Sequence, residues 1–133
     1  ESDFTSIGKD LIQLTNGDII VVGQVSFRGS KSILIIRLNS LGELIWTSYF
    51  NDSELSTHLL YLNDDNIILG GYGFAGSFLI SVDGNGRKNW IQKYSSMKKL
   101  NAFDKVGSGF VLVGQSYSDR GMMIRAGILG EIK

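Results

Sequence analysis

The sequence predicts an all-β fold, and three observations carry that prediction. Short runs rich in Ile, Val, Leu, Phe and Tyr recur along the whole length, separated by Gly, Asn, Asp and Ser. β-Branched residues dominate these runs, as is typical of strands. No segment keeps its apolar residues at helical spacing over three turns, so the strand interpretation applies to the whole chain.

Each expected strand is one apolar run bounded by turn residues. The turns at 15–18, 63–66 and 107–109 are rich in Gly, Asn and Asp, which supply the left-handed backbone that tight hairpins need. In chain order, the expected strands span residues 10–14, 18–25, 32–38, 43–50, 58–62, 66–73, 77–82, 88–95, 101–106, 109–117, 122–127 and 131–133.

The chain also repeats itself three times. Residues 18–24, 66–72 and 109–115 each hold a turn residue, a mostly apolar stretch and a glycine. A second shared block follows each of them, and its turn glycine recurs every 44 residues, at positions 42, 86 and 130. Four strands in a unit of about 44 residues is the period of a β-propeller blade. We therefore expect a propeller-like array of three four-stranded antiparallel blades.

The second shared block resembles a known repeat. Residues 38–46 and 82–90 contain Asn/Asp-x-x-Gly-x-x-x-Trp after a strand. This pattern resembles the tryptophan-docking repeats of quinoprotein-type propellers, and it is similar to the glycine-rich propeller repeats of secreted bacterial and archaeal proteins. In such families the tryptophan packs between neighbouring blades, so the resemblance implies structural roles for Trp46 and Trp90. Blade packing is also expected at the repeated glycines, which are Gly42, Gly86, Gly130, Gly23, Gly71 and Gly114.

The third copy of the repeat stops before its tryptophan, which would be residue 134. In a cyclic reading, Glu1 takes that place after Lys133. We therefore expect one domain with blade repeats at about 5–50, 51–95 and 96–133 plus 1–4, the last blade being split between the C- and N-termini. An open array leaves a strand edge and an apolar face unpaired. The expected subunit interface comprises Glu1, Ser2, Asp3, Phe4, Glu131, Ile132 and Lys133.

Copies of the chain would then join head to tail. Two copies form a closed six-bladed ring if the rotation closes, and a filament or tube if it does not. The other alternative is a piece of a longer chain with further blades. The chain begins with Glu1 rather than Met, which suggests either a removed secretion signal or an excised fragment, and we expect an extracellular or cell-surface location.

The composition limits the classes of partner. The 13 Lys and Arg residues balance 13 Asp and Glu residues, so the chain lacks the basic excess of nucleic-acid binders and of proteins drawn to anionic membranes. There is no cysteine, which rules out disulfides and thiolate metal sites. Every apolar run is too short for a helix that inserts into a membrane.

Residues with catalytic or metal-binding chemistry are isolated in the sequence. His58 is the only histidine, and it lacks the companions of a catalytic triad or a zinc site. The turns at 63–66 and 83–86 are rich in oxygen ligands, which leaves calcium binding as the alternative to plain turn chemistry. Lys98 and Lys99 are expected on the surface. We therefore expect that the protein is not an enzyme and that it has neither a metal site nor a cofactor.

Two functions from different classes remain. The first is a non-catalytic structural module that assembles with copies of itself. The alternative is a carbohydrate-binding propeller lectin. Arg37 and Arg125 occupy the same repeat position and suit sugar hydroxyls or carboxylates, with a salt bridge between blades as the other interpretation. Aromatic residues that follow the shared glycine strand suit sugar stacking, with core packing as the other interpretation; they are Phe27, Tyr72, Phe74 and Tyr117.

Overall fold

A computed structural model describes residues 4–50 and 55–133, and this part of the chain forms eleven strands and no helix. The strands are β1 (Phe4–Gln13), β2 (Ile19–Phe27), β3 (Ser30–Leu38), β4 (Leu44–Phe50), β5 (Leu55–Asn63), β6 (Asn66–Gly73), β7 (Gly76–Val82), β8 (Lys88–Tyr94), β9 (Met97–Val106), β10 (Gly109–Ser116) and β11 (Gly121–Ala126). The predicted all-β class is confirmed.

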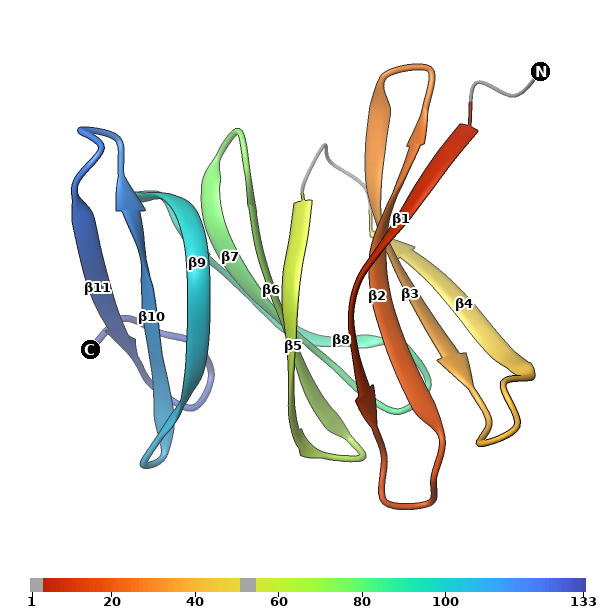
Figure 1. Ribbon diagram of the computed structural model, residues 1–133. Helices are drawn as coiled ribbons and strands as arrows, with labels where there is room; N and C mark the ends of the chain where they lie inside the picture. The colour runs from red at the N-terminus through yellow and green to blue at the C-terminus, as the bar shows by residue number, and fades with distance from the viewer. Residues whose placement is uncertain (1–3, 51–54) are drawn as a thin grey trace.

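Three antiparallel sheets stand face to face in chain order (Figure 1). The first sheet has the order β1-β2-β3-β4 and the second β5-β6-β7-β8, so each is a simple meander. The third sheet has the order β9-β10-β11, and a single bridge between Ala126 and Ile132 begins a fourth strand beside β11. The stack is open, with the first and third sheets at its two ends (Figure 1).

Two strands begin at least four residues earlier than their local pattern predicts. β1 begins at Phe4 and β9 at Met97, and the first halves of both carry polar or charged residues. These halves are extended because β2 and β10 offer them backbone partners as far as Phe27 and Ser116. Pairing across the sheet, rather than local propensity, therefore sets their length.

The apolar core lies in two layers, one on each face of the second sheet. The first layer joins the first and second sheets through side chains such as Ile20, Ile35 and Leu69. The second layer joins the second and third sheets through side chains such as Ile68, Leu79 and Leu112. Because both of its faces are covered, the middle sheet has nearly continuous apolar strands, and every residue of β7 is buried.

The repeats of the sequence are also repeats of the structure. At Gly42, Gly86 and Gly130 the chain makes the same turn, with φ values of 84, 82 and 81°. In each turn the glycine N–H donates to the carbonyl three residues earlier. This arrangement is a type I turn closed by a left-handed residue, for which glycine has no steric penalty. The strand after each turn then pairs in the same register with the strand before it.

The structure corrects one part of the expected split blade. Phe4 pairs with Phe27, so it belongs to β1 of the first sheet rather than to an outer strand of the third. The reason is that β2 extends beyond Gly23 and satisfies the backbone hydrogen bonds of this segment. Glu1, Ser2 and Asp3 lie outside the described residues.

Candidate functional site

A pocket of about 470 Å³ opens at the end of the stack where the β2–β3 and β6–β7 turns lie. All three sheets contribute to it. Its walls are Gly29, Lys31, Tyr72, Gly73, Phe74, Lys98 and Lys99. This volume falls within the usual range of small-molecule sites.

Next to the lining residues in the chain, two segments approach each other closely. Gly76 has a φ of 101°, and a Cβ on it would lie 2.9 Å from the carbonyl oxygen of Tyr94. Only glycine therefore lets the β8–β9 corner lie against the β6–β7 turn. The buried Ser77 hydroxyl then donates to the carbonyl of Met97 at 2.9 Å, which fixes the start of β9. Lys98 and Lys99 follow directly and are held beside the β6–β7 turn.

The side chains that line the pocket are cationic or aromatic. The Lys99 ammonium lies 5.8 Å from the centre of the Tyr72 ring, within the range of a cation–π interaction. Phe74 is 95% exposed at the tip of its hairpin. Lys98 contacts Asp119 at 3.5 Å, but both side chains are exposed, so the pair is weak. The pocket therefore combines positive charge with apolar ring surface.

At the opposite end of the first two sheets, Arg37 ties the sheets together. Its Nε and one terminal nitrogen donate to Asp18 at 3.0 and 2.7 Å, and its other terminal nitrogen donates to the Gly84 carbonyl at 2.7 Å. The Trp46 indole N–H donates to the same carbonyl at 3.0 Å. The ion pair of Arg37 therefore lies within the first sheet, and its hydrogen bond to the Gly84 carbonyl joins the first sheet to the second.

Next to this bridge, Asp64 accepts hydrogen bonds from two side chains. The Tyr61 hydroxyl donates to it at 2.6 Å and the Thr15 hydroxyl at 2.7 Å. The Tyr61 hydrogen bond, followed by that of Thr15, lowers the pKa of Asp64, and the same Tyr61–Asp64 bond raises the pKa of Tyr61. The cluster connects the β1–β2 turn to the β5–β6 turn.

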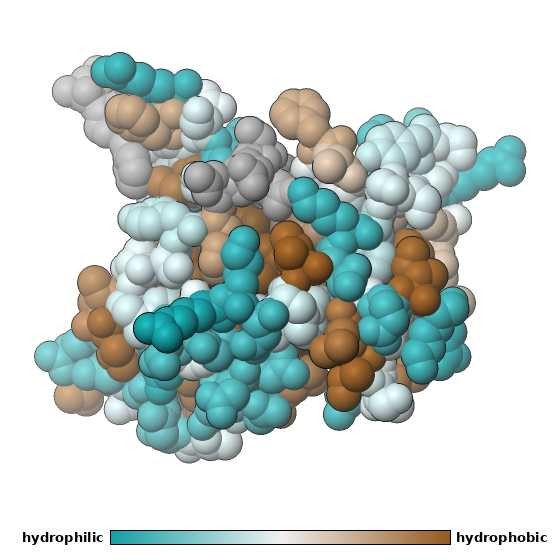
Figure 2. Space-filling model, turned by 180° about the vertical axis from the view of Figure 1, so that it is seen from behind, coloured by the Kyte–Doolittle hydropathy of each residue, from teal (hydrophilic) through white to brown (hydrophobic). Residues whose placement is uncertain are grey.

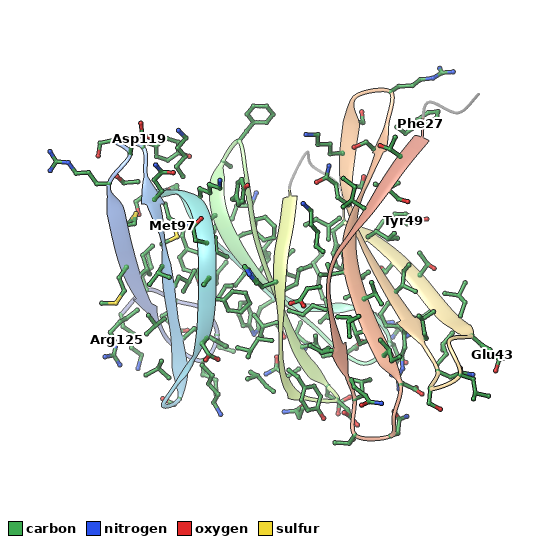
Figure 3. All side chains as sticks on the ribbon, viewed as in Figure 1. Phe27, Glu43, Tyr49, Met97, Asp119 and Arg125 are labelled. Carbon is green, nitrogen blue, oxygen red and sulfur yellow. The ribbon has the colours of Figure 1, made fainter. Side chains whose placement is uncertain are left out.

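The four predicted ligand residues are not brought together. Arg37 is engaged between sheets as described, and Arg125 lies at the lower end of the third sheet, away from Asp119 and Phe27 at the upper end (Figure 3). Tyr72 lines the pocket at the upper end, and Tyr117 is exposed in the β10–β11 turn. The role of Lys98 and Lys99 in the pocket escaped sequence reasoning, because only the folding of the β8–β9 corner places them beside Tyr72.

The repeated tryptophans lie against repeated glycines. A Cβ on Gly86 would lie 2.8 Å from the Trp46 ring, and one on Gly130 would lie 2.8 Å from the Trp90 ring. Each ring therefore covers the turn of the following sheet. An equivalent Cβ on Gly42 meets no described atom within 4 Å.

The other glycines predicted to pack lie within central strands. A Cβ on Gly23 would lie 2.3 Å from the Ile7 carbonyl oxygen, and one on Gly114 would lie 2.1 Å from that of Lys99. Both positions lie beside irregularities in strand pairing, where the neighbouring backbone comes unusually close. Gly71 is buried in β6.

The residues with catalytic or metal-binding chemistry make contacts typical of surface and turn residues. His58 is exposed, and its ring meets Phe103 edge-to-face at 6.5 Å. The Asp83 carboxylate accepts from the backbone N–H groups of Asn85 and Arg87, and Asn63 accepts from that of Asp65, as in ordinary turns. Within the described ranges, no group of three or more His, Cys, Asp or Glu residues is placed to hold a metal.

The C-terminal residues close the third turn. Glu131, Ile132 and Lys133 are exposed, and the Lys133 N–H donates to the Arg125 carbonyl at 2.9 Å. The hydroxyl of Tyr94, which is buried at the end of β8, donates to the Gly130 carbonyl of the same turn at 2.5 Å. Burial, together with the nearby Glu131 carboxylate, raises the pKa of Tyr94 well above its ordinary range.

The raised pKa of Tyr94 predicts a loss of stability at alkaline pH. The native state holds the Tyr94 proton more tightly than the unfolded chain, so its contribution is complete below the unfolded pKa of about 10 and declines above it. We expect Tyr94→Phe to flatten this alkaline decline, although losing the hydrogen bond costs about 1 kcal/mol at neutral pH. Urea unfolding at about pH 8 and about pH 11 measures both effects. Tyr117→Phe, at an exposed position, is the control, and an unchanged alkaline slope in Tyr94→Phe would contradict the assignment.

Comparison with known proteins adds little to these observations. No protein-family model matches the sequence, and no curated protein matches it significantly. Among solved structures, one match is a protein of unknown function from Bacteroides caccae, with 8% sequence identity and a TM-score of 0.46. The match covers 96% of this chain and 80% of that one, but similarity at this level transfers neither fold nor function. In the described part of the chain, no helix is long and apolar enough to cross a membrane.

Proposed function

We propose that this protein is a non-catalytic assembly module of propeller type, in which the sheets act as blades. The outer face of the third sheet in one copy packs on the outer face of the first sheet in the next. The observation that carries this proposal is the exposed face of the first sheet, which repeats the residues of a face that is buried inside the molecule.

The two faces are equivalent by repeat position. In the second sheet, Ile67, Leu69, Phe78 and Ile80 are at most 1% exposed, because the first sheet covers them. The corresponding residues of the first sheet are also large and apolar, and they are only half-buried; they are Ile19, Val21, Leu34 and Ile36. Their sequence neighbours Ile20, Val22, Ile33 and Ile35 face the second sheet, so side-chain alternation points these four outward.

Further apolar side chains extend this face. Leu11, which pairs with Val21, is 62% exposed, and Tyr49, which pairs with Leu34, is 57% exposed. Hydrophobic groups reach the surface at the left edge of Figure 2, where the first sheet lies. A contiguous apolar surface of this kind is typical of an interaction site.

The turn at Gly42 supports the same proposal. The equivalent turns at Gly86 and Gly130 are each covered by a tryptophan ring from the preceding sheet, whereas Gly42 is open. Its neighbour Leu41 is 83% exposed. The first sheet therefore presents an open turn of the type that a preceding sheet covers twice within the molecule, although the third sheet ends before a tryptophan of its own.

The third sheet carries a matching donor. Within the molecule, Arg37 crosses to the carbonyl of Gly84 in the next sheet's turn. Arg125 has the repeat position of Arg37, is exposed and lies on the face away from the second sheet, since its neighbours Ile124 and Ala126 belong to the core. Ser40 has the repeat position of Gly84. The proposed contact is thus between Arg125 of one copy and the Ser40 carbonyl of the next.

This contact is between faces and uses no shared strand. A strand formed jointly by 131–133 and the N-terminal residues would require Phe4 to leave its pairing with Phe27 in β1. Because the contact is head to tail, it yields either a closed ring of two copies or an open filament.

Native mass measurement over a range of concentrations tests the proposal. We expect masses that are multiples of 14.6 kDa, with a dominant dimer if the ring closes and a series that grows with concentration if it does not. A single species of monomer mass from micromolar to submillimolar concentration would contradict self-assembly.

A further inference from the structure

We propose that the pocket at the β2–β3 and β6–β7 turns binds an acidic sugar, with a hexuronate unit as its ligand. This inference concerns the end of the stack where the turns gather and does not depend on assembly through the sheet faces. It rests on the charge, the aromatic rings and the construction of the pocket.

Positive charge is concentrated in this pocket although the whole chain is neutral. Lys31 comes from the first sheet, and Lys98 and Lys99 come from the third, so segments far apart in the sequence place three lysines in the lining of one cavity. Among the residues that the structure describes, the charged ones that line the pocket are all lysines. Asp119 contacts Lys98 from outside the lining, and that exposed pair is weak enough for a ligand carboxylate to replace it.

The aromatic residues offer a surface on which a sugar ring can stack, next to the positive charge. Phe74 is almost fully exposed at a hairpin tip, where burial in the core does not explain a large apolar side chain. Tyr72 lies next to it in the pocket wall, with the Lys99 ammonium within cation–π distance. The C–H face of a pyranose stacks on such rings, and the ammonium beside the ring then meets a carboxylate carried by the same sugar.

Other anions fit the pocket less well. The zero net charge of the chain argues against a nucleic-acid polymer, which requires a broad basic surface. Within the described residues, the pocket is framed by strand ends and hairpin turns, and it has no helix N-terminus of the kind that commonly binds phosphate.

Buried contacts also hold one wall of the pocket in place. Gly76 permits the close approach of the β8–β9 corner, and the buried hydrogen bond from Ser77 to the Met97 carbonyl holds that corner in place. Buried contacts therefore hold the backbone that carries Lys98 and Lys99, so the two lysines start from a fixed place beside the β6–β7 turn.

Calorimetric titration with trisaccharides of galacturonate, glucuronate and mannuronate tests the proposal. Neutral galactotriose, AMP and inorganic phosphate serve as comparison ligands. We expect at least one uronate to bind and all three comparison ligands to bind at least about tenfold more weakly. Binding should weaken as salt is added, because ammonium–carboxylate attraction is screened.

Variants locate the binding site. Lys98→Gln with Lys99→Gln, and separately Phe74→Ala, are each expected to weaken uronate binding about tenfold. Lys105→Gln, at the far end of the same strand, and Tyr117→Ala, in a turn outside the pocket, are expected to leave it unchanged. Thermal unfolding of each variant identifies any general loss of folding.

Three outcomes would overturn the inference. The first is that none of the three uronates binds. The second is that the neutral sugar binds as well as the acidic one, which removes the role of the lysines. The third is that AMP or phosphate binds more tightly than every uronate, which assigns the pocket to phosphate instead.

Discussion

Replacing Trp46 with alanine is expected to lower the free energy of unfolding by about 3 kcal/mol, as truncation of a large packed ring does. The ring lies over Gly86 of the next sheet, and its N–H donates to the Gly84 carbonyl. The substitution therefore removes apolar contact and a hydrogen bond from one junction at once. Chemical denaturation followed by circular dichroism measures the loss.

Alanine substitutions at Gly42, Gly86 and Trp46 separate the effect of the ring contact from that of backbone strain. Gly42 and Gly86 have φ values of 84 and 82°, so alanine is strained at both, by about 1 kcal/mol. Only at Gly86 does the added Cβ also meet the Trp46 ring, and we expect a total loss of about 2–4 kcal/mol there. In the Trp46→Ala background the difference between the two glycine variants should shrink. Equal losses at Gly42 and Gly86 in the wild-type background would show that the tryptophan does not dock as described.

Replacing Val21 with aspartate is expected to abolish assembly while each copy stays folded. Val21 is half-buried on the outer face of the first sheet, so a carboxylate there is partly solvated in the single copy but buried without a partner in the proposed contact. We expect association to weaken at least about a hundredfold, because burial of an unpaired charge costs roughly 3 kcal/mol or more. Light scattering coupled to size exclusion measures the change in mass.

The opposite face supplies an independent variant. Arg125→Ala should weaken association by removing the donor to the next copy, and since Arg125 is exposed the fold should be unaffected. Ser108→Asp, in the exposed β9–β10 turn, adds the same charge as Val21→Asp outside the proposed contact and should leave the mass unchanged. If wild-type protein assembles and both face variants assemble equally well, the contact lies elsewhere.

Local signals in the sequence were sufficient for the strands and turns. Alternating apolar residues and left-handed turn residues act within a few positions, so β2, β3 and the Gly42, Gly86 and Gly130 turns were predictable. The apolar run at 67–69 did not single out the middle sheet, because the run at 19–22 in the first sheet is as continuous although one face of that sheet is uncovered.

Features that depend on distant pairing were not predictable. Polar residues at the start of β1 and β9 are extended only because β2 and β10 lie beside them. The pairing of Phe4 with Phe27 likewise arises from strand length rather than from repeat phase. Lys98 and Lys99 looked like an ordinary surface pair, and their place in a pocket follows from the buried contact between Ser77 and Met97. An extracellular location stays a prediction.

The coverage of the middle sheet on both faces has a consequence for how the protein opens. In a linear stack, each sheet is stabilised by its own hairpins and by the junctions with its neighbours, so an end sheet has one junction and the middle sheet has two. Local unfolding therefore starts at either end of the stack and reaches β5–β8 last. The amide protons of the second sheet are then the slowest to exchange. Ring closure would give every sheet two junctions and convert this graded opening into a single cooperative transition.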